Sequence, residues 1–64
     1  MNAGERFKMV VENENQIQAK TQLFGTLNEA KRAAKAWLTP CRSVLGFKVF
    51  VIDRARALII FRAQ

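Results

Sequence analysis

Side chains that could do acid, base or nucleophilic chemistry are few and scattered in this sequence of 64 residues. No two of its carboxylates stand at a spacing that predicts a catalytic pair, and they are Glu5, Glu12, Glu14, Glu29 and Asp53. Histidine is absent and Cys41 is the single cysteine, so neither a histidine relay nor a metal cluster is expected. The three glycines are too dispersed for a phosphate-binding loop. The sequence therefore predicts no catalytic residue, no metal, no cofactor and no small-molecule substrate.

Basic side chains are the most numerous of the ionisable residues in this sequence. Eleven Lys and Arg against five Asp and Glu give a net charge of +6 and a pI near 10.5. Such a charge attracts polyanions at long range, so the expected partner is nucleic acid or an acidic protein surface of a host. The residues expected to contact phosphates from strands are Arg6, Lys8, Lys20 and Lys48. A second candidate set, for which a solvated helix face is the default interpretation, is Lys31, Arg32 and Lys35.

The segment from Thr26 to Pro40 predicts the single helix. Thr26 followed by Glu29 is the pattern of a capping box, in which both side chains satisfy backbone N–H groups. Apolar residues recur every three or four positions and form one stripe, namely Leu27, Ala30, Ala34, Trp37 and Leu38. Pro40 should end the helix near Leu38. We expect Trp37 to be the large core residue that packs this helix onto a sheet.

Four further segments predict strands, and they run from Arg6 to Glu12, Gln16 to Leu23, Gly46 to Ile52 and Arg56 to Arg62. Asn13 to Asn15 supply turn chemistry between the first two strands, and Thr39 to Leu45 is expected to be a plain connector. The order strand, strand, helix, strand, strand predicts a single small basic domain over residues 1–64. Its fold class is α+β, a two-layer β-β-α-β-β arrangement with four antiparallel strands and one helix on one face.

Alternation along the strands assigns each residue to one of two sheet faces. The face under the helix is expected to hold Phe7, Met9, Val11, Ile17, Leu23, Phe47, Val49 and Val51. The basic half of the second face is expected to hold Arg6, Lys8, Gln18, Lys20 and Lys48. Its apolar half is expected to hold Val10, Phe50, Ile52, Leu58 and Ile60.

Three uses of this second face are open. A nucleic-acid platform would stack bases on Phe50 and hold phosphates with the surrounding Lys and Arg. A protein interface would use the apolar half, with the basic rim selecting an acidic partner. A homodimer would bury the same patch of Phe50, Ile52, Leu58 and Ile60 and so enlarge a small core.

No stretch of the sequence predicts a signal peptide or a membrane span. The longest apolar runs are VFVI and ALIIF, far short of the roughly 20 residues that cross a bilayer. Because one cysteine cannot form an intramolecular disulfide, a reducing interior fits the chain. We expect a cytoplasmic protein of a bacterial host cell, with no membrane partner.

Two resemblances involve the helix. The run from Phe7 to Glu12, the Thr26-Leu27-Asn28-Glu29-Ala30 start and the later Gly46-Phe47-x-Val49 resemble the small phage-encoded inhibitor of bacterial RNA polymerase. That resemblance implies a protein of host takeover that docks on a host enzyme, and none of its binding residues is carried over. Thr26, Glu29 and Ala30 are also similar to the helix start in the arm-DNA-binding domain of phage-type integrases. That second resemblance implies strands that enter a DNA groove.

The leading hypothesis is a non-enzymatic regulatory protein of phage or mobile-element origin that binds nucleic acid through its basic sheet face. The alternative is a protein-directed inhibitor or adaptor of a host nucleic-acid enzyme, such as bacterial RNA polymerase. The first predicts steep salt dependence and reliance on Lys8 and Lys20, whereas the second predicts reliance on Phe50.

Overall fold

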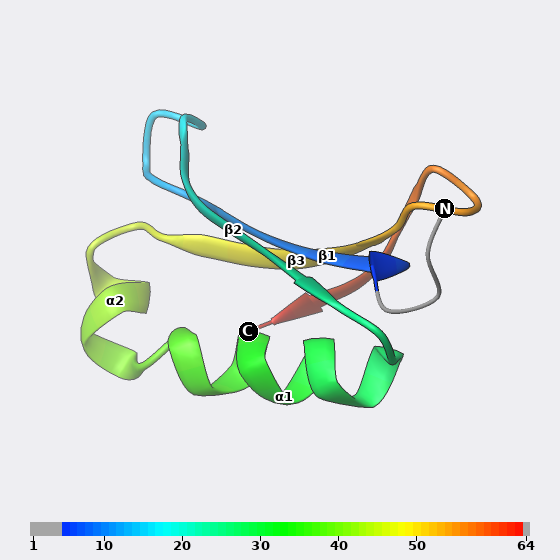
Figure 1. The fold of residues 1–64 in the computed structure, drawn as a ribbon. Coiled ribbons are helices and arrows are strands. Elements are labelled where there is room, and N and C mark those ends of the chain that lie inside the picture. The colour runs from blue at the N-terminus through cyan, green and yellow to red at the C-terminus, as the bar shows by residue number, and fades with distance from the viewer. Residues whose placement is uncertain (1–4, 64) are drawn as a thin grey trace.

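A computed structural model describes residues 5–63, so the two ends of the predicted domain, residues 1–4 and 64, lie outside the described part. The elements in chain order are β1 (Phe7–Glu12), β2 (Gln18–Phe24), α1 (Leu27–Trp37), α2 (Pro40–Val44), β3 (Lys48–Asp53) and β4 (Leu58–Ala63). The strands form one antiparallel sheet in the order β2-β1-β3-β4. Figure 1 shows α1 lying along one face of this sheet. The predicted α+β fold class is confirmed.

Helix α1 begins and ends where the sequence predicts. The Thr26 side chain accepts a hydrogen bond from the Glu29 backbone N–H at 3.3 Å, and the Leu38 N–H donates to the Ala34 carbonyl at 3.1 Å. Ala30 and Ala34 face the sheet and are fully buried. Their small side chains let the helix approach the sheet closely, and the sheet side of this core consists of Phe7, Met9, Val11, Val49 and Val51.

The segment predicted to be a plain connector contains a second, short helix, α2. Thr39 caps it by accepting a hydrogen bond from the Arg42 N–H at 3.4 Å, and Pro40 occupies the first turn, where a missing N–H costs nothing. The Arg42 guanidinium lies 4.2 Å from the centre of the Trp37 ring and donates to the Trp37 carbonyl at 2.7 Å. The connector prediction is wrong because Pro40, which cannot continue α1, equally suits the first turn of a new helix.

Trp37 packs against the core, as predicted. Its ring meets the ring of Phe47 edge to face, with 5.2 Å between the centroids. Trp37 thus contacts both Phe47 and Arg42, and because Arg42 belongs to α2, these contacts attach α2 to the rest of the domain.

The turn between β1 and β2 is built on Asn13, in the region where the sequence predicts turn chemistry. The Asn13 side-chain oxygen accepts from the N–H groups of Asn15 at 2.9 Å and Ile17 at 3.1 Å. The left-handed residue is Gln16, with φ of 64°. Gly46, with φ of 89°, lies beside this turn, and a Cβ placed there would come within 2.9 Å of the Glu14 Cβ. The loop before β3 therefore packs directly against the first hairpin.

The facing of β2 differs from the prediction. Lys8 and Val10 pair with Leu23 and Thr21, whereas Val11 pairs with Lys20, so Lys20 lies on the helix side of the sheet and Leu23 on the other. Ile17 stays in the turn and is exposed. The physical reason is Phe24, which pairs with Phe7 and packs against the core in place of the smaller Leu23. A register shift between Val11 and Glu12 leaves Ala19 without a partner on β1, so Gln18 still lies on the predicted face whereas the residues after Ala19 do not.

The facing of β4 also differs. Ile59 pairs with Ile52, Leu58 pairs with Asp53, and a register shift follows. Ile60 packs against the core, so the predicted placement of Leu58 and Ile60 beside Phe50 and Ile52 is wrong. The run ALIIF is apolar in both phases, and Phe61, the largest of its residues, packs against the core beneath α1. The strand starts at Leu58 and not at Arg56, because Arg54 to Ala57 form the turn.

Candidate nucleic-acid interface

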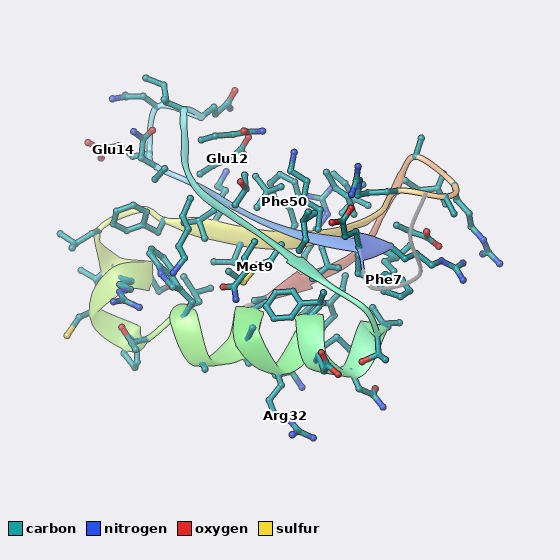
Figure 2. All side chains as sticks on the ribbon, viewed as in Figure 1. Phe7, Met9, Glu12, Glu14, Arg32 and Phe50 are labelled. Carbon is teal, nitrogen blue, oxygen red and sulfur yellow. The ribbon has the colours of Figure 1, made fainter. Side chains whose placement is uncertain are left out.

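The open face, which we define as the side of the sheet away from α1, consists of three rows of paired residues. Cross-strand partners point to the same side of a sheet, so the register fixes each row. The first row is Leu23, Lys8, Ile52 and Ile59, the second is Thr21, Val10, Phe50 and Arg62, and the third is Gln18, Glu12 and Lys48. Figure 2 shows Glu12 and Phe50 on this side and Met9 on the side of α1.

Phe50 occupies the centre of this arrangement. Arg62 is its partner across β4, and Lys48 precedes it by two residues on β3. Val10, its partner on β1, is 0% exposed although it lies on the open face. The neighbouring side chains thus close the sheet over Val10, whereas Phe50 itself remains partly exposed.

A hollow of about 490 Å³ opens beside the Phe50 ring, at the end of the sheet where β1 finishes and β3 begins. We call it the Phe50 hollow, and it is lined by Glu12, Gln16, Lys48, Val49, Phe50, Arg62 and Ala63. Lys48 and Arg62 are cations, Glu12 is an acceptor when ionised, and Gln16 offers both donors and an acceptor. Within residues 5–63 every ion pair involves Asp53; Glu12 and Lys48 are cross-strand partners, but no two charged groups of the hollow lie within ion-pair distance of each other.

The structure uses Arg6 for another purpose. Its Nε and Nη2 donate to the two carboxylate oxygens of Asp53 at 3.1 and 3.0 Å, and its guanidinium stacks 5.2 Å from the Phe7 ring. Asp53 is only 4% exposed at its side chain. The hydrogen bond from Arg6 holds the pKa of Asp53 below its ordinary value, although burial acts in the opposite direction, and the Ala55 N–H supports the lowering. Arg6, whose own pKa is raised by the same bond, joins β1 to the end of β3.

The remaining predicted basic residues divide between the two sides of the molecule. Lys8 and Lys48 lie on the open face as predicted, whereas Lys20 does not. Lys31 and Lys35 place their ammonium groups 5.4 and 5.8 Å from the centre of the Phe61 ring, on the helix side. Arg32 points away from the sheet (Figure 2). The helix set therefore cannot act together with the open face on one short ligand.

Arg62 and Ile59 are open-face residues that the sequence prediction missed. Arg62 is a charged residue that closes an apolar strand, which is a recognisable signal, but its pairing with Phe50 depends on a register shift that no pattern in the sequence reveals. Of the four strand residues predicted to contact phosphates, Lys8 and Lys48 therefore lie on the open face, and Arg62 joins them there.

In the part of the chain that the structure describes, no three His, Cys, Asp or Glu side chains gather where they could hold a metal ion. Neither α1 nor α2 is long and apolar enough to cross a membrane, and these are the helices found among residues 5–63. Cys41 is exposed on α2.

Comparison with protein-family models, with curated proteins and with solved structures finds no match to this chain. The two resemblances in the sequence therefore stay predictions. The geometry and charge of the open face are what a functional proposal must rest on.

Proposed function

We propose that this protein is a non-enzymatic regulator that binds nucleic acid through the open face of its sheet. The observation that carries the proposal is the position of Phe50 between Lys48 and Arg62, beside the Phe50 hollow. An aromatic ring flanked by cations is the arrangement by which sheet surfaces stack a base and hold the adjoining phosphates.

The charge of the whole chain supports this proposal. The net charge of +6 raises the local concentration of any polyanion, and Lys8, Lys48 and Arg62 place three of the positive charges on the open face. Glu12 is the single acidic residue in the three rows, so this face keeps a positive balance. Phosphate contacts would supply most of the affinity, and the apolar residues between them would exclude water.

A salt titration tests the proposal. We expect a labelled single strand of about 12 nucleotides to bind, with log K falling against log salt at a slope of about −2, since three phosphate contacts contribute about 0.7 each. Anisotropy between about 0.05 and 0.3 M NaCl measures this slope. In the double variant Lys48→Gln, Arg62→Gln, one contact remains and the slope should fall to about −0.7.

Arg32→Gln combined with Lys35→Gln is the matched control. It removes the same charge from the helix side and should weaken binding less and leave the slope nearly unchanged. Equal losses in the two double variants would place the phosphate contacts elsewhere, and failure of the wild-type protein to bind at low salt would refute the proposal.

A second candidate function, a protein-directed adaptor or inhibitor, is favoured by the surface of α2. Val44 is 87% exposed and Leu45 is 64% exposed, and with Pro40 and Cys41 they line a shallow apolar depression. Apolar side chains gathered on a small domain are typical of a partner surface. This function predicts binding to a host nucleic-acid enzyme, with purified bacterial RNA polymerase as the first to test by sedimentation. Val44→Asp should abolish that binding, and the Lys48→Gln, Arg62→Gln variant should retain it.

A further inference from the structure

We propose that the Phe50 hollow takes one unpaired base of a single strand and prefers a base that offers N–H donors, guanine first. This inference rests on the proposed nucleic-acid function and adds the form of the ligand and the base.

The requirement for an unpaired base follows from Phe50. Its ring can stack only against the flat face of a base, and in a duplex both faces of each base are already covered by neighbouring pairs. The hollow of about 490 Å³ lies within the range of about 300–1,000 Å³ of small-molecule sites, so it suits one nucleotide and is too small for a duplex. Lys48 and Arg62 line the same hollow and can reach phosphates of the strand that carries the stacked base.

The preference for donors follows from Glu12. An ionised carboxylate only accepts hydrogen bonds, and Glu12 forms no ion pair among residues 5–63. Guanine presents two parallel N–H donors, N1–H and N2–H, on its Watson–Crick edge, which match the two oxygens of one carboxylate. Thymine and uracil present a single N–H between two carbonyl oxygens, and those oxygens would repel Glu12. Gln16, which also lines the hollow, has an amide that can donate to the guanine O6.

The test compares three labelled ligands at about 0.15 M salt, namely an oligothymidine of about 12 nucleotides, the same strand with one central guanine, and the guanine strand paired with its complement. We expect the guanine strand to bind several-fold more tightly than oligothymidine, and the duplex to bind most weakly. Phe50→Leu should weaken single-strand binding about tenfold, the loss typical of one base stack, with little effect on the duplex. Phe50→Trp keeps an aromatic face and should preserve binding.

Glu12→Gln separates base recognition from charge. This variant should bind both single strands somewhat more tightly, because a negative charge is removed, and should lose the preference for guanine. Thermal unfolding of each variant verifies that the domain is folded, and Arg32→Gln, on the helix side, is the control for a change of charge.

The outcomes separate the choice of base from the binding of nucleic acid in general. Salt-dependent binding that is equal for single strand and duplex, and indifferent to Phe50→Leu, would overturn this inference and leave the proposed nucleic-acid function standing. Equal affinity for the two single strands would also overturn it. Loss of all binding by the wild-type protein would overturn both.

Discussion

Within residues 5–63, Asp53 is the side chain that accepts the largest number of hydrogen bonds. Its buried carboxylate receives both donors of Arg6, the Ala55 N–H at 3.0 Å and a more distant contact from Arg56 at 3.8 Å. These contacts tie the start of β1 to the end of β3 and order the turn that follows. A bidentate Arg–carboxylate pair with one buried partner is a specific positioning device, so its loss should affect folding before it affects any ligand.

We expect Asp53→Asn to weaken the fold at neutral pH and to reduce its dependence on acid pH. Because the pKa of Asp53 is lower in the folded protein than in the unfolded chain, its stabilisation is fully present above the ordinary value of about 3.9 and is lost as the pH falls through the folded pKa. Thermal unfolding from about pH 6 to pH 2 measures this. The melting temperature of the variant should fall less over that range than that of the wild type.

Glu14→Gln is the control for this comparison, since it removes an exposed carboxylate that forms no ion pair within residues 5–63. It should keep the acid sensitivity of the wild type. If Asp53→Asn loses as much stability in acid as the wild type, another carboxylate carries the effect.

At the scale of elements, the sequence predicted the central strands well and the edge strands poorly. Strands β1 and β3 pair with each other without a register shift, so simple alternation of side chains holds between them, and Lys8, Lys48, Phe50 and Ile52 lie on the predicted face. The edge strands β2 and β4 are held on one side only, and both contain a register shift. A shift reverses the facing of the side chains on one side of it, so a single alternating pattern misplaces Lys20 after the shift in β2 and Leu58 before the shift in β4, and it also misplaces Ile60 at that shift.

The turn between β3 and β4 contains an alanine, Ala57, in a backbone conformation that favours glycine. Ala57 has φ of 56°, a left-handed conformation that costs an L-residue about 1–2 kcal/mol. Ala57→Gly should therefore stabilise the domain by about 0.5–1 kcal/mol, after allowing for the greater freedom of glycine in the unfolded chain. Denaturant unfolding measures the difference. Ala55→Gly, in the same turn but without a positive φ, should destabilise, and equal effects of the two changes would contradict the left-handed geometry.

At the scale of the whole molecule, the two-layer fold separates three surfaces that could bind a partner. The open face carries the Phe50 hollow, the helix side carries Lys31 and Lys35 around Phe61, and α2 lies at the end where β1 and β2 are joined (Figure 1). A nucleic acid on the open face would leave α2 free to meet a protein. The two candidate functions are thus sterically compatible and can be tested independently.

The exposed position of α2 predicts that its apolar residues contribute little to folding. The double variant Val44→Ser, Leu45→Ser should change the free energy of unfolding by less than about 1 kcal/mol, because surface substitutions usually cost within about 0.5 kcal/mol each. Val10→Ala is the contrasting change on the open face, and it should cost about 2 kcal/mol because Val10 is fully buried. Denaturant unfolding compares them. A large loss in the α2 variant would show that this surface packs against something in the folded state.

The contact of Trp37 with Phe47 and Arg42 has an optical consequence. Trp37 is the only tryptophan and tyrosine is absent, so the near-ultraviolet emission of the protein arises almost entirely from one ring. That ring packs on the helix side beside α2 and does not line the Phe50 hollow. Its emission should therefore change when the domain unfolds or α2 detaches, and stay constant when the open face is occupied. Exchanging the two aromatic positions, by Trp37→Phe with Phe50→Trp, would move the single tryptophan to the Phe50 hollow, where its emission should respond to the proposed ligand.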